Sequence, residues 1–486
     1  MALSSKFSDL QYYAEALSEG YQLLPFNFHK LKSEIYLVVN LVGEHLIISR
    51  KLLIELVEGK LESTNQYYNE FKAKHFIMDC DSNVALDLLS LKVRTKQFPV
   101  SQFTALHMFV VTLRCDYTCK YCQVSRRMEG DDSYDMTQGS ADSALNLVFK
   151  SPSKSIKIEF QGGEPLINFP LIRYIVGKAT EINNTEKRTL QFVITTNLTF
   201  LSDEILNFCS KYDVFISTSL DGPEAIHNKN RPRPNKDGHK RTVDGINRIQ
   251  SVLGIDKIAA LMTTTEESLA FPSEIVDEYV RNNLHSIFLR PLSPYGFAIK
   301  TKQIEKYNIT KWMKFYIEGL DYIIQLNKAG YYLVEQYTAI ILRKILTPGN
   351  TGYVDLQSPA GIGISGVVYN YDGDVYASDE SRMLKEMGDE TFKLGNVNTN
   401  SYEEIFLSDN LLDALENSIA ESAPMCSDCG LLNYCGSDPV YHHATQGDVV
   451  GKKPLSFYCN RNTSVIEHIF SLLEDVENRQ VLESWI

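Results

Sequence analysis

The 486-residue sequence has no apolar run near the roughly 20 residues that a bilayer requires. Its most apolar stretches, such as 35–39 and 287–289, have the length of a strand, and the N-terminus has no apolar core of a signal peptide. Positive charge is also scarce, because 48 Lys and Arg stand against 61 Asp and Glu, a formal net charge of −13. A phosphate backbone would be repelled on average. We therefore expect a cytoplasmic protein with neither a membrane nor a nucleic-acid partner.

The sequence also lacks internal repeats, and its 44% hydrophobic residues exclude disorder as a description of the whole chain. The length predicts about three domains. Residues 1–100 suggest a small α+β module that is winged-helix-like. Strands are predicted over 35–40 and 45–48 around a Gly43 turn, and Ser49 is the expected N-cap of a helix over 51–58.

Residues 101–310 alternate regularly between short apolar runs and amphipathic segments. The predicted strands are 107–113, 156–160, 190–196, 214–220, 258–264 and 286–292, and the predicted helices are 137–150, 169–183, 202–211, 242–253 and 271–283. Such alternation favours an α/β fold with a parallel sheet, here an open or partial (β/α)6 barrel. A helical linker over 311–357 follows. Residues 358–486 are predicted to form a cysteine-rich extension that begins with a hairpin around Asp372-Gly373.

Three cysteines, Cys115, Cys119 and Cys122, follow the first predicted strand of the barrel. Structural zinc takes four ligands, whereas a [4Fe–4S] cube held by three cysteines leaves one iron open. The spacing alone is also compatible with zinc, a redox thiol or coincidence. The position favours the cluster, because active residues of parallel barrels gather at the carboxyl ends of the strands.

Polar groups stand at the ends of three further predicted strands. The second strand is followed by Gly162-Gly163-Glu164-Pro165, the third ends at Asn197, and the fourth runs into Ser219-Leu-Asp-Gly-Pro. Paired glycines allow a ligand to approach the backbone, and Glu164 can accept a hydrogen bond from an ammonium group. Because these strand ends share one edge of the sheet, the sequence predicts a single site there.

Together these motifs resemble the radical S-adenosylmethionine (SAM) superfamily over roughly residues 105–300. The resemblance implies that the three cysteines hold a [4Fe–4S] cluster whose open iron binds SAM, and that a 5′-deoxyadenosyl radical takes an unactivated hydrogen. It also implies SAM contacts from Tyr121, Gly162, Gly163, Glu164, Pro165, Asn197, Ser219 and Arg231. For Arg231 the alternative is a solvated residue in a basic loop.

A second set of four cysteines comprises Cys426, Cys429, Cys435 and Cys459. On spacing alone the set suits zinc or [4Fe–4S]. Beside a radical SAM core it resembles the SPASM extension, which usually holds two auxiliary clusters. Non-ligands occupy the places of further cysteines of that extension, at Ser358, Ser378 and Pro439. The resemblance therefore implies one auxiliary [4Fe–4S] cluster.

Asp379 occupies the place of an aspartate proposed as proton acceptor in sulfatase-maturating relatives. Two further cysteines, Cys80 and Cys209, fit no ligand pattern and are predicted to be buried.

SPASM proteins mostly modify peptides, and the N-terminal module resembles an element that captures a leader peptide as an added strand. Segments 369–380 and 435–443 resemble the radical SAM maturase of the His-Xaa-Ser peptide system. This implies a ribosomally made precursor peptide, a second radical SAM maturase as a neighbour, and a reductant such as flavodoxin or ferredoxin. The predicted reaction is a dehydrogenative cross-link at an unactivated side-chain carbon. The alternatives are a side-chain oxidase of the anaerobic sulfatase-maturating kind and a non-catalytic zinc or iron–sulfur peptide-binding scaffold.

Overall fold

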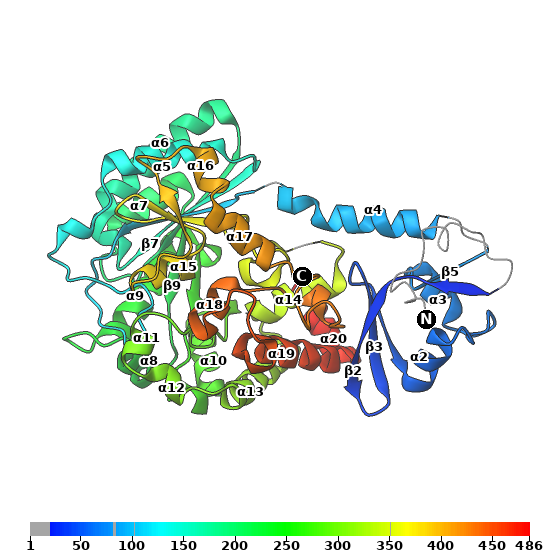
Figure 1. Cartoon of the computed structure of the whole chain (residues 1–486). Helices are drawn as coiled ribbons and strands as arrows, with labels where there is room; N and C mark the ends of the chain where they lie inside the picture. The colour runs from blue at the N-terminus through cyan, green and yellow to red at the C-terminus, as the bar shows by residue number, and fades with distance from the viewer. Residues whose placement is uncertain (1–19, 81–83, 102, 350) are drawn as a thin grey trace. The chain divides into compact units, whose positions relative to one another are not determined.

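The computed structural model describes residues 20–80, 84–101, 103–349 and 351–486, which form two compact units (Figure 1). The first unit takes the described residues within 1–101, 343–351 and 420–436. The second takes those within 102–342, 352–419 and 437–486. This division is coarser than the four predicted domains, whose boundaries stay predictions.

The first unit is built on an antiparallel sheet in the order β2 (Phe26–Lys32), β3 (Ile35–Asn40), β4 (His45–Ser49). A separate pair joins β1 (Tyr21–Leu23) to β5 (Ile77–Asp79), and the helices are α2 (Arg50–Val57), α3 (Tyr68–Ala73) and α4 (Ala85–Gln97). Ser49 caps α2 by accepting a hydrogen bond from the N–H of Leu52, as expected. The predicted hairpin and the helix after it are confirmed.

Residues 420–436, which carry three cysteines, belong to this first unit. The side chain of Asn27 on β2 donates to the carbonyl oxygen of Ser427 at 3.0 Å. The hydroxyl of Tyr434 donates to the carbonyl oxygen of Gly43 at 2.8 Å, in the turn between β3 and β4. These contacts join a late segment of the chain to an early sheet, which its position in the sequence does not indicate.

The second unit contains an eight-stranded sheet in the order β10-β9-β8-β7-β6-β13-β14-β15. Its parallel strands are β6 (Leu106–Thr112), β7 (Ser155–Gly162), β8 (Thr189–Thr195), β9 (Phe215–Ser219) and β10 (Ile258–Leu261). They alternate with α5 (Gln138–Lys150), α6 (Phe169–Glu186), α7 (Asp203–Tyr212), α8 (Glu224–Asn230), α9 (Gly238–Leu253) and α10 (Pro272–Arg281). The α/β class and the first five predicted strands are confirmed.

The sixth predicted strand, 286–292, differs from the expectation. Only β11 (Ser286–Ile287) forms, and it pairs with β12 (Val334–Glu335) outside the main sheet. Beyond it, the N–H of Leu289 donates to the buried carboxylate of Glu335 at 3.1 Å, so a side chain replaces a neighbouring strand as its partner.

The C-terminal hairpin extends the main sheet instead of standing apart from it. Strand β13 (Gly366–Tyr369) pairs in parallel with β6 and antiparallel with β14 (Asp374–Tyr376), which pairs with β15 (Lys393–Asn396). The imidazole of His107 on β6 stacks on the ring of Tyr369 at 5.9 Å between centroids. The hairpin therefore shares the core of the parallel strands.

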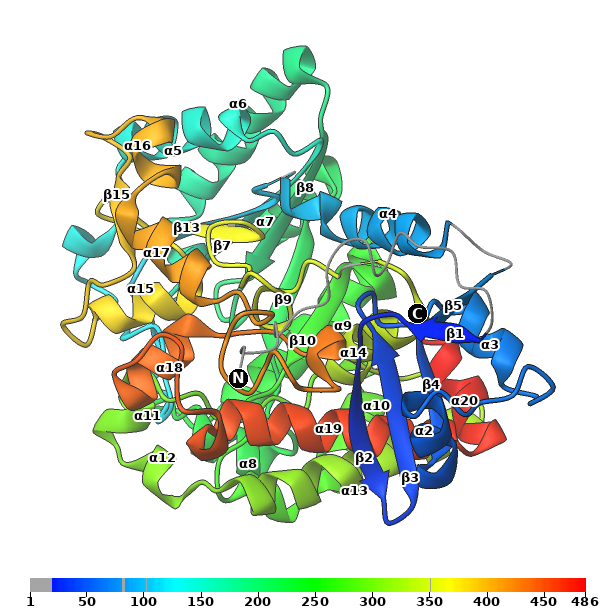
Figure 2. The same ribbon diagram turned by 45° about the vertical axis from the view of Figure 1, so that its right-hand side comes forward.

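The remaining helices lie after β10, and all of them except residues 343–346 belong to this unit. They are α11 (Phe297–Lys300), α12 (Gln303–Lys306), α13 (Ile309–Lys328), α14 (Gln336–Leu346), α15 (Asp379–Lys385), α16 (Tyr402–Phe406), α17 (Asp409–Asn417), α18 (Pro439–Gln446), α19 (Phe457–Leu473) and α20 (Val476–Glu483). Helix α13 packs against α10, α19 and α20 (Figure 2). Among the described residues, no helix has the length and apolarity needed to cross a membrane.

The two cysteines outside the ligand patterns differ in burial. Cys209 is buried in α7 as predicted, whereas Cys80 is exposed, so the prediction for Cys80 was wrong.

Candidate functional site

A cavity of about 190 Å³ lies at the carboxyl ends of β7 to β10 in the second unit. It brings together residues that the sequence placed at one site: Cys115, Cys119, Cys122, Tyr121, Gly162, Gly163, Asn197, Ser219, Arg231 and Asp379. The motifs meet in this cavity because the carboxyl ends of parallel strands lie at one edge of the sheet.

The cysteine loop after β6 is held by backbone hydrogen bonds to the segment after α8. The N–H of Thr118 donates to the carbonyl oxygen of Pro232 at 3.0 Å, and the N–H of Lys120 donates to that of Asn230 at 3.1 Å. Within the loop, the N–H of Tyr117 donates to Sγ of Cys115 at 3.4 Å. The loop is therefore fixed along its length.

The three thiols line one cavity. Among the described residues, no group of three or more His, Cys, Asp or Glu side chains is arranged to hold a single metal ion. Three cysteines are the donor set of a [4Fe–4S] cube that leaves one iron open. Burial raises the pKa of Cys119 to about 12 and raises the pKa of Cys115 well above its usual value. Metal binding displaces such thiol protons, and this donor set fits a three-cysteine cluster.

The two glycines after β7 have a packing role beside any ligand role. A Cβ on Gly162, where φ is +140°, would overlap the carbonyl oxygen of Thr112, and one on Gly163 would overlap that of Arg114. The N–H of Gly163 donates to Thr112 O at 2.9 Å, and the N–H of Glu164 donates to Arg114 O at 2.7 Å. Only glycine lets the end of β7 approach the cysteine loop this closely.

Glu164 and Pro165 do not line the cavity. The carboxylate of Glu164 is fully buried and accepts hydrogen bonds from the hydroxyl of Thr196 at 2.6 Å and the N–H of Asn197 at 2.7 Å. Burial raises the pKa of Glu164 to about 7, although these hydrogen bonds act in the opposite direction. Glu164 thus ties β7 to the residues after β8, and its contact with the SAM amine stays a prediction.

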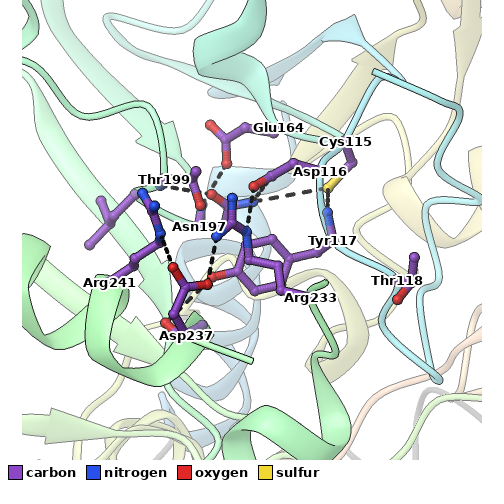
Figure 3. Close-up of polar contacts among 12 residues, drawn as sticks. Cys115, Asp116, Tyr117, Thr118, Glu164, Asn197, Thr199, Arg233, Asp237 and Arg241 are labelled. Atoms are coloured by element: carbon purple, nitrogen blue, oxygen red, sulfur yellow. Dashed lines mark hydrogen bonds and ion pairs between the residues drawn. The ribbon is translucent and has the colours of Figure 1, made fainter. Parts of the chain in front are cut away.

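Asn197 is oriented by an ionic network that the sequence analysis did not foresee (Figure 3). Its Nδ2 donates to Oδ1 of Asp116 at 2.8 Å, and Nε of Arg233 donates to Oδ2 of Asp116 at 3.0 Å. Arg233 also donates to Asp237 at 2.7 Å, at the start of α9. Two features of the sequence could have indicated this network: the acidic Asp116 inside the cysteine motif and the basic loop that contains Arg233.

Arg231 and Tyr121 share one buried partner, Asp221. The hydroxyl of Tyr121 donates to the Asp221 carboxylate, and Nε of Arg231 donates to Oδ2 of Asp221 at 3.2 Å. The Arg231 guanidinium also lies 5.3 Å from the centre of the Tyr121 ring. Because the Arg231 side chain is only 14% exposed, the solvated-loop alternative is wrong. The Ser-Leu-Asp-Gly-Pro motif contained Asp221, but nothing in the sequence named its partners.

Asp379 is the first residue of α15 and lines the same cavity. It accepts a hydrogen bond from the side chain of Gln161 at 3.1 Å, and the guanidinium of Arg382 lies 3.5 Å away. Further lining residues that the sequence analysis missed are Gln161, Thr263, Arg290 and Met383.

The second set of cysteines is divided between the two units. Cys426, Cys429 and Cys435 lie in the first unit, and Cys459 lies in the first turn of α19 in the second. The N–H of Leu431 donates to Sγ of Cys429 at 3.4 Å. Their role as ligands of an auxiliary cluster stays a prediction.

The family model of the Radical SAM superfamily matches residues 109–269, from β6 to the segment before α10. Residues 109–269 are a radical SAM domain. The match supports the predicted enzyme class, and a radical SAM domain implies SAM and one [4Fe–4S] cluster.

The first two curated relatives align with this chain over only part of their own length. The uncharacterized protein MJ0907 of Methanocaldococcus jannaschii is 29% identical over 185 residues, 38% of this chain and 61% of that protein. The radical SAM cyclopropyl synthase TigE of Paramaledivibacter caminithermalis is 25% identical over 212 residues, 41% of this chain and 44% of TigE. The chain thus spans about half the length of these relatives.

Solved structures with this fold cover more of the chain. The structure of anSMEcpe with bound AdoMet has a TM-score of 0.63 at 17% identity, covering 78% of this chain and 100% of that one. Streptococcus suis SuiB bound to the precursor peptide SuiA has a TM-score of 0.52 at 16% identity, covering 89% and 98%. At these identities the likeness concerns the fold alone.

Proposed function

We propose that this radical SAM enzyme modifies a ribosomally made precursor peptide by a dehydrogenative cross-link at an unactivated side-chain carbon. The observation that carries the proposal is the cavity in which three cysteines, Asp379 and Arg231 meet, the last held by its buried partner Asp221. The similarity to a cyclopropyl synthase and the shared fold with SuiB, which binds a precursor peptide, support a peptide substrate.

When bound to Cys115, Cys119 and Cys122, the cluster supplies one-electron cleavage of SAM and thereby a radical that takes a hydrogen atom from carbon. The chain's own residues orient SAM. Arg231 would bind its carboxylate, and Tyr121 would contact its adenine, since both line the cavity. The other proposed contacts are Gly162, Gly163, Glu164, Pro165, Asn197 and Ser219.

Asp379 is assigned as the group that accepts the proton lost by the substrate. A dehydrogenative coupling removes one hydrogen atom, one proton and one electron. Asp379 faces the cavity beside the SAM-binding residues and is held there by Gln161. An auxiliary [4Fe–4S] cluster on Cys426, Cys429, Cys435 and Cys459 would supply an electron acceptor.

The first unit is proposed to capture the leader of the peptide as an added strand, because β2 and β4 are the outer strands of its antiparallel sheet. The same proposal includes a precursor peptide of the His-Xaa-Ser type, a second radical SAM maturase, a flavodoxin or ferredoxin reductant and a cytoplasmic location.

The second candidate function is side-chain oxidation. It is favoured by the fold shared with anSMEcpe and by the similarity to a serine-type sulfatase-maturating enzyme of Bacteroides thetaiotaomicron, which is 20% identical.

Anaerobic co-expression with the short open reading frame beside its gene, followed by mass spectrometry of the peptide, tests the function. We expect a loss of two hydrogen atoms with a new bond between two side chains in the fragment spectra. The same loss confined to one side chain would favour the oxidase.

Two variants serve as controls in that experiment. Cys119→Ala should abolish both product and 5′-deoxyadenosine. Asp379→Asn should retain 5′-deoxyadenosine formation with dithionite and lower product at least about 100-fold, the usual range for loss of a proton acceptor. A colourless, zinc-loaded protein that forms no 5′-deoxyadenosine would contradict the proposal and favour the scaffold.

A further inference from the structure

A second cavity, of about 60 Å³, lies within the second unit and shares Arg290 with the first. The two cavities also meet at the first turn of α15. There Asp379 lines the first cavity and the next residue, Glu380, lines the second. A group bound in the second cavity would therefore lie close to the site of the reaction.

The lining of this second cavity is rich in carboxylates. Asp355, Glu380 and Asp438 line it together with two guanidinium groups, those of Arg290 and Arg461. Burial raises the pKa of Glu380 to about 7 and raises the pKa of Asp355 and Asp438. Neighbouring carboxylates raise the pKa of Glu380 and Asp438 further, whereas Arg461 and Arg290 act in the opposite direction on Asp355. With all three carboxylates ionised, the lining carries one net negative charge.

The two arginines are already engaged by protein groups. Arg461 donates to the side chain of Asn462 at 3.0 Å and to the hydroxyl of Tyr337 at 3.2 Å, and it stacks over the Tyr337 ring at 5.2 Å. The guanidinium of Arg290 lies 3.9 Å from the carboxylate of Glu380. They are thus poorly placed to receive an anionic ligand.

Acceptor groups, in contrast, are left without donors. In the described part of the chain, no hydrogen bond or ion pair reaches the carboxylate of Asp355. The hydroxyl of Tyr295, a residue only 1% exposed, lines the cavity and has no hydrogen-bond partner. A buried hydroxyl without a partner is unfavourable, so its presence points to a ligand that completes the site.

We propose that this second cavity binds a positively charged side chain of the substrate peptide, adjacent to the residue that reacts. The inference rests on the proposed function, because it assigns the cavity to the same substrate. A cation would receive hydrogen-bond acceptors from Asp355 and Glu380 and an aromatic wall in which Phe288 stacks on Tyr337 at 5.7 Å.

The test is calorimetric titration of the reconstituted holoenzyme with SAM bound, using capped amino acids as probes. N-acetyl-lysine and N-acetyl-arginine N-methylamides are the cations, the norleucine derivative is the uncharged control, and the glutamate derivative is the anion. We expect at least one cation to bind at least about tenfold more tightly than norleucine, since a charged hydrogen bond contributes that much. Asp355→Asn should remove this preference, and Asp413→Asn, on the exposed face of α17, should keep it.

The inference is overturned if neither cation exceeds norleucine, if glutamate binds most tightly, or if Asp355→Asn keeps the preference. Comparison of the probes on the unaltered enzyme keeps the test valid even if a variant misfolds. SAM cleavage by dithionite is measured in the same preparations. If SAM is cleaved but the cations are not preferred, only the inference about the second cavity is wrong. If the cations are preferred but SAM is not cleaved, the proposed function is wrong.

Discussion

At the scale of single residues, Asp221 organises the cavity that holds the three cysteines, although it does not line it. Its Oδ2 accepts from Tyr121 and Arg231, and its Oδ1 accepts from the N–H of Thr263 at 3.3 Å. A fully buried carboxylate with a buried guanidinium is stabilising only as a complete pair, because either charge alone is costly to desolvate.

Asp221→Asn should therefore destabilise the enzyme by about 3 kcal/mol and weaken SAM binding, because the Arg231 guanidinium loses its counter-charge. Denaturant unfolding and SAM titration under anaerobic conditions measure both effects. The matched control is Asp213→Asn, which removes an aspartate that is 75% exposed and pairs with Lys257. Its effect should stay below about 1 kcal/mol. Equal stability losses in the two variants would contradict this account.

The sequence was sufficient to predict those cavity residues whose place depends only on standing at the end of a strand. Cys115, Asn197 and Ser219 follow strands whose carboxyl ends meet at one edge of a parallel sheet, so topology alone brings them together. Residues such as Asp116 and Arg290 could not be predicted, because their roles depend on partners more than 80 positions away in the chain.

At the scale of elements, the attachment of β13 to β6 links the C-terminal hairpin to the parallel strands. His107 on β6 donates from Nε2 to the carbonyl oxygen of Thr104 at 3.1 Å, and its Nδ1 accepts from the hydroxyl of Tyr369 at 3.0 Å. These are the roles of the neutral imidazole, whose Nε2 carries the proton that the Thr104 carbonyl oxygen accepts. Burial accordingly lowers the pKa of His107 from 6.5 to about 4.

Because the pKa of His107 is lower in the folded protein than in the unfolded chain, acid favours the unfolded chain. The contribution of His107 to stability is therefore present above pH 6.5 and is lost as the pH falls toward 4. Between pH values of about 7.5 and 5.5, His107 should contribute a loss of about 1 kcal/mol. His107→Gln should show a correspondingly smaller loss over this range in chemical unfolding. Tyr369→Phe removes the same hydrogen bond but keeps the imidazole, so it should be destabilised at both pH values and lose stability with acid as the unaltered protein does. An unchanged pH dependence in His107→Gln would refute the assignment.

Local patterns were sufficient to predict most strands and helices of the barrel. The caps at Ser49, Thr137 and Ser202 mark helix starts in the sequence, and each accepts the expected backbone hydrogen bond. The pairing of β13 with β6 and the loss of the sixth strand were not predictable, because apolar alternation does not reveal which strand lies next to which.

At the scale of the whole molecule, the first unit is assembled from three separate segments of the chain. Lys96 in α4 donates to the side chain of Asn433 at 2.5 Å, and the side chain of Asn433 donates to the carbonyl oxygen of Asn40 at 2.9 Å. Contiguity along the sequence predicted instead that residues 358–486 stay together. Residues 420–436 hold three of the nine cysteines, but cysteine content does not indicate that a segment belongs with an early sheet.

The iron content of the reconstituted chain tests the proposed number of clusters. We expect about eight irons per chain, and Cys429→Ala should reduce this to about four, since each cube holds four. The variant should still form 5′-deoxyadenosine with dithionite but lose the peptide product. About twelve irons in the unaltered protein, or undiminished product from Cys429→Ala, would contradict a single auxiliary cluster.

The discontinuous make-up of the first unit limits how this chain can be re-engineered. The unit also includes residues 343–351 and 420–436, and the first hundred residues taken alone would leave the side chain of Asn27 on β2 and the carbonyl oxygen of Gly43 without their partners, Ser427 and Tyr434. A transplant of this unit onto another protein therefore needs all three segments, and exchange of the N-terminal segment alone should yield an insoluble chimera.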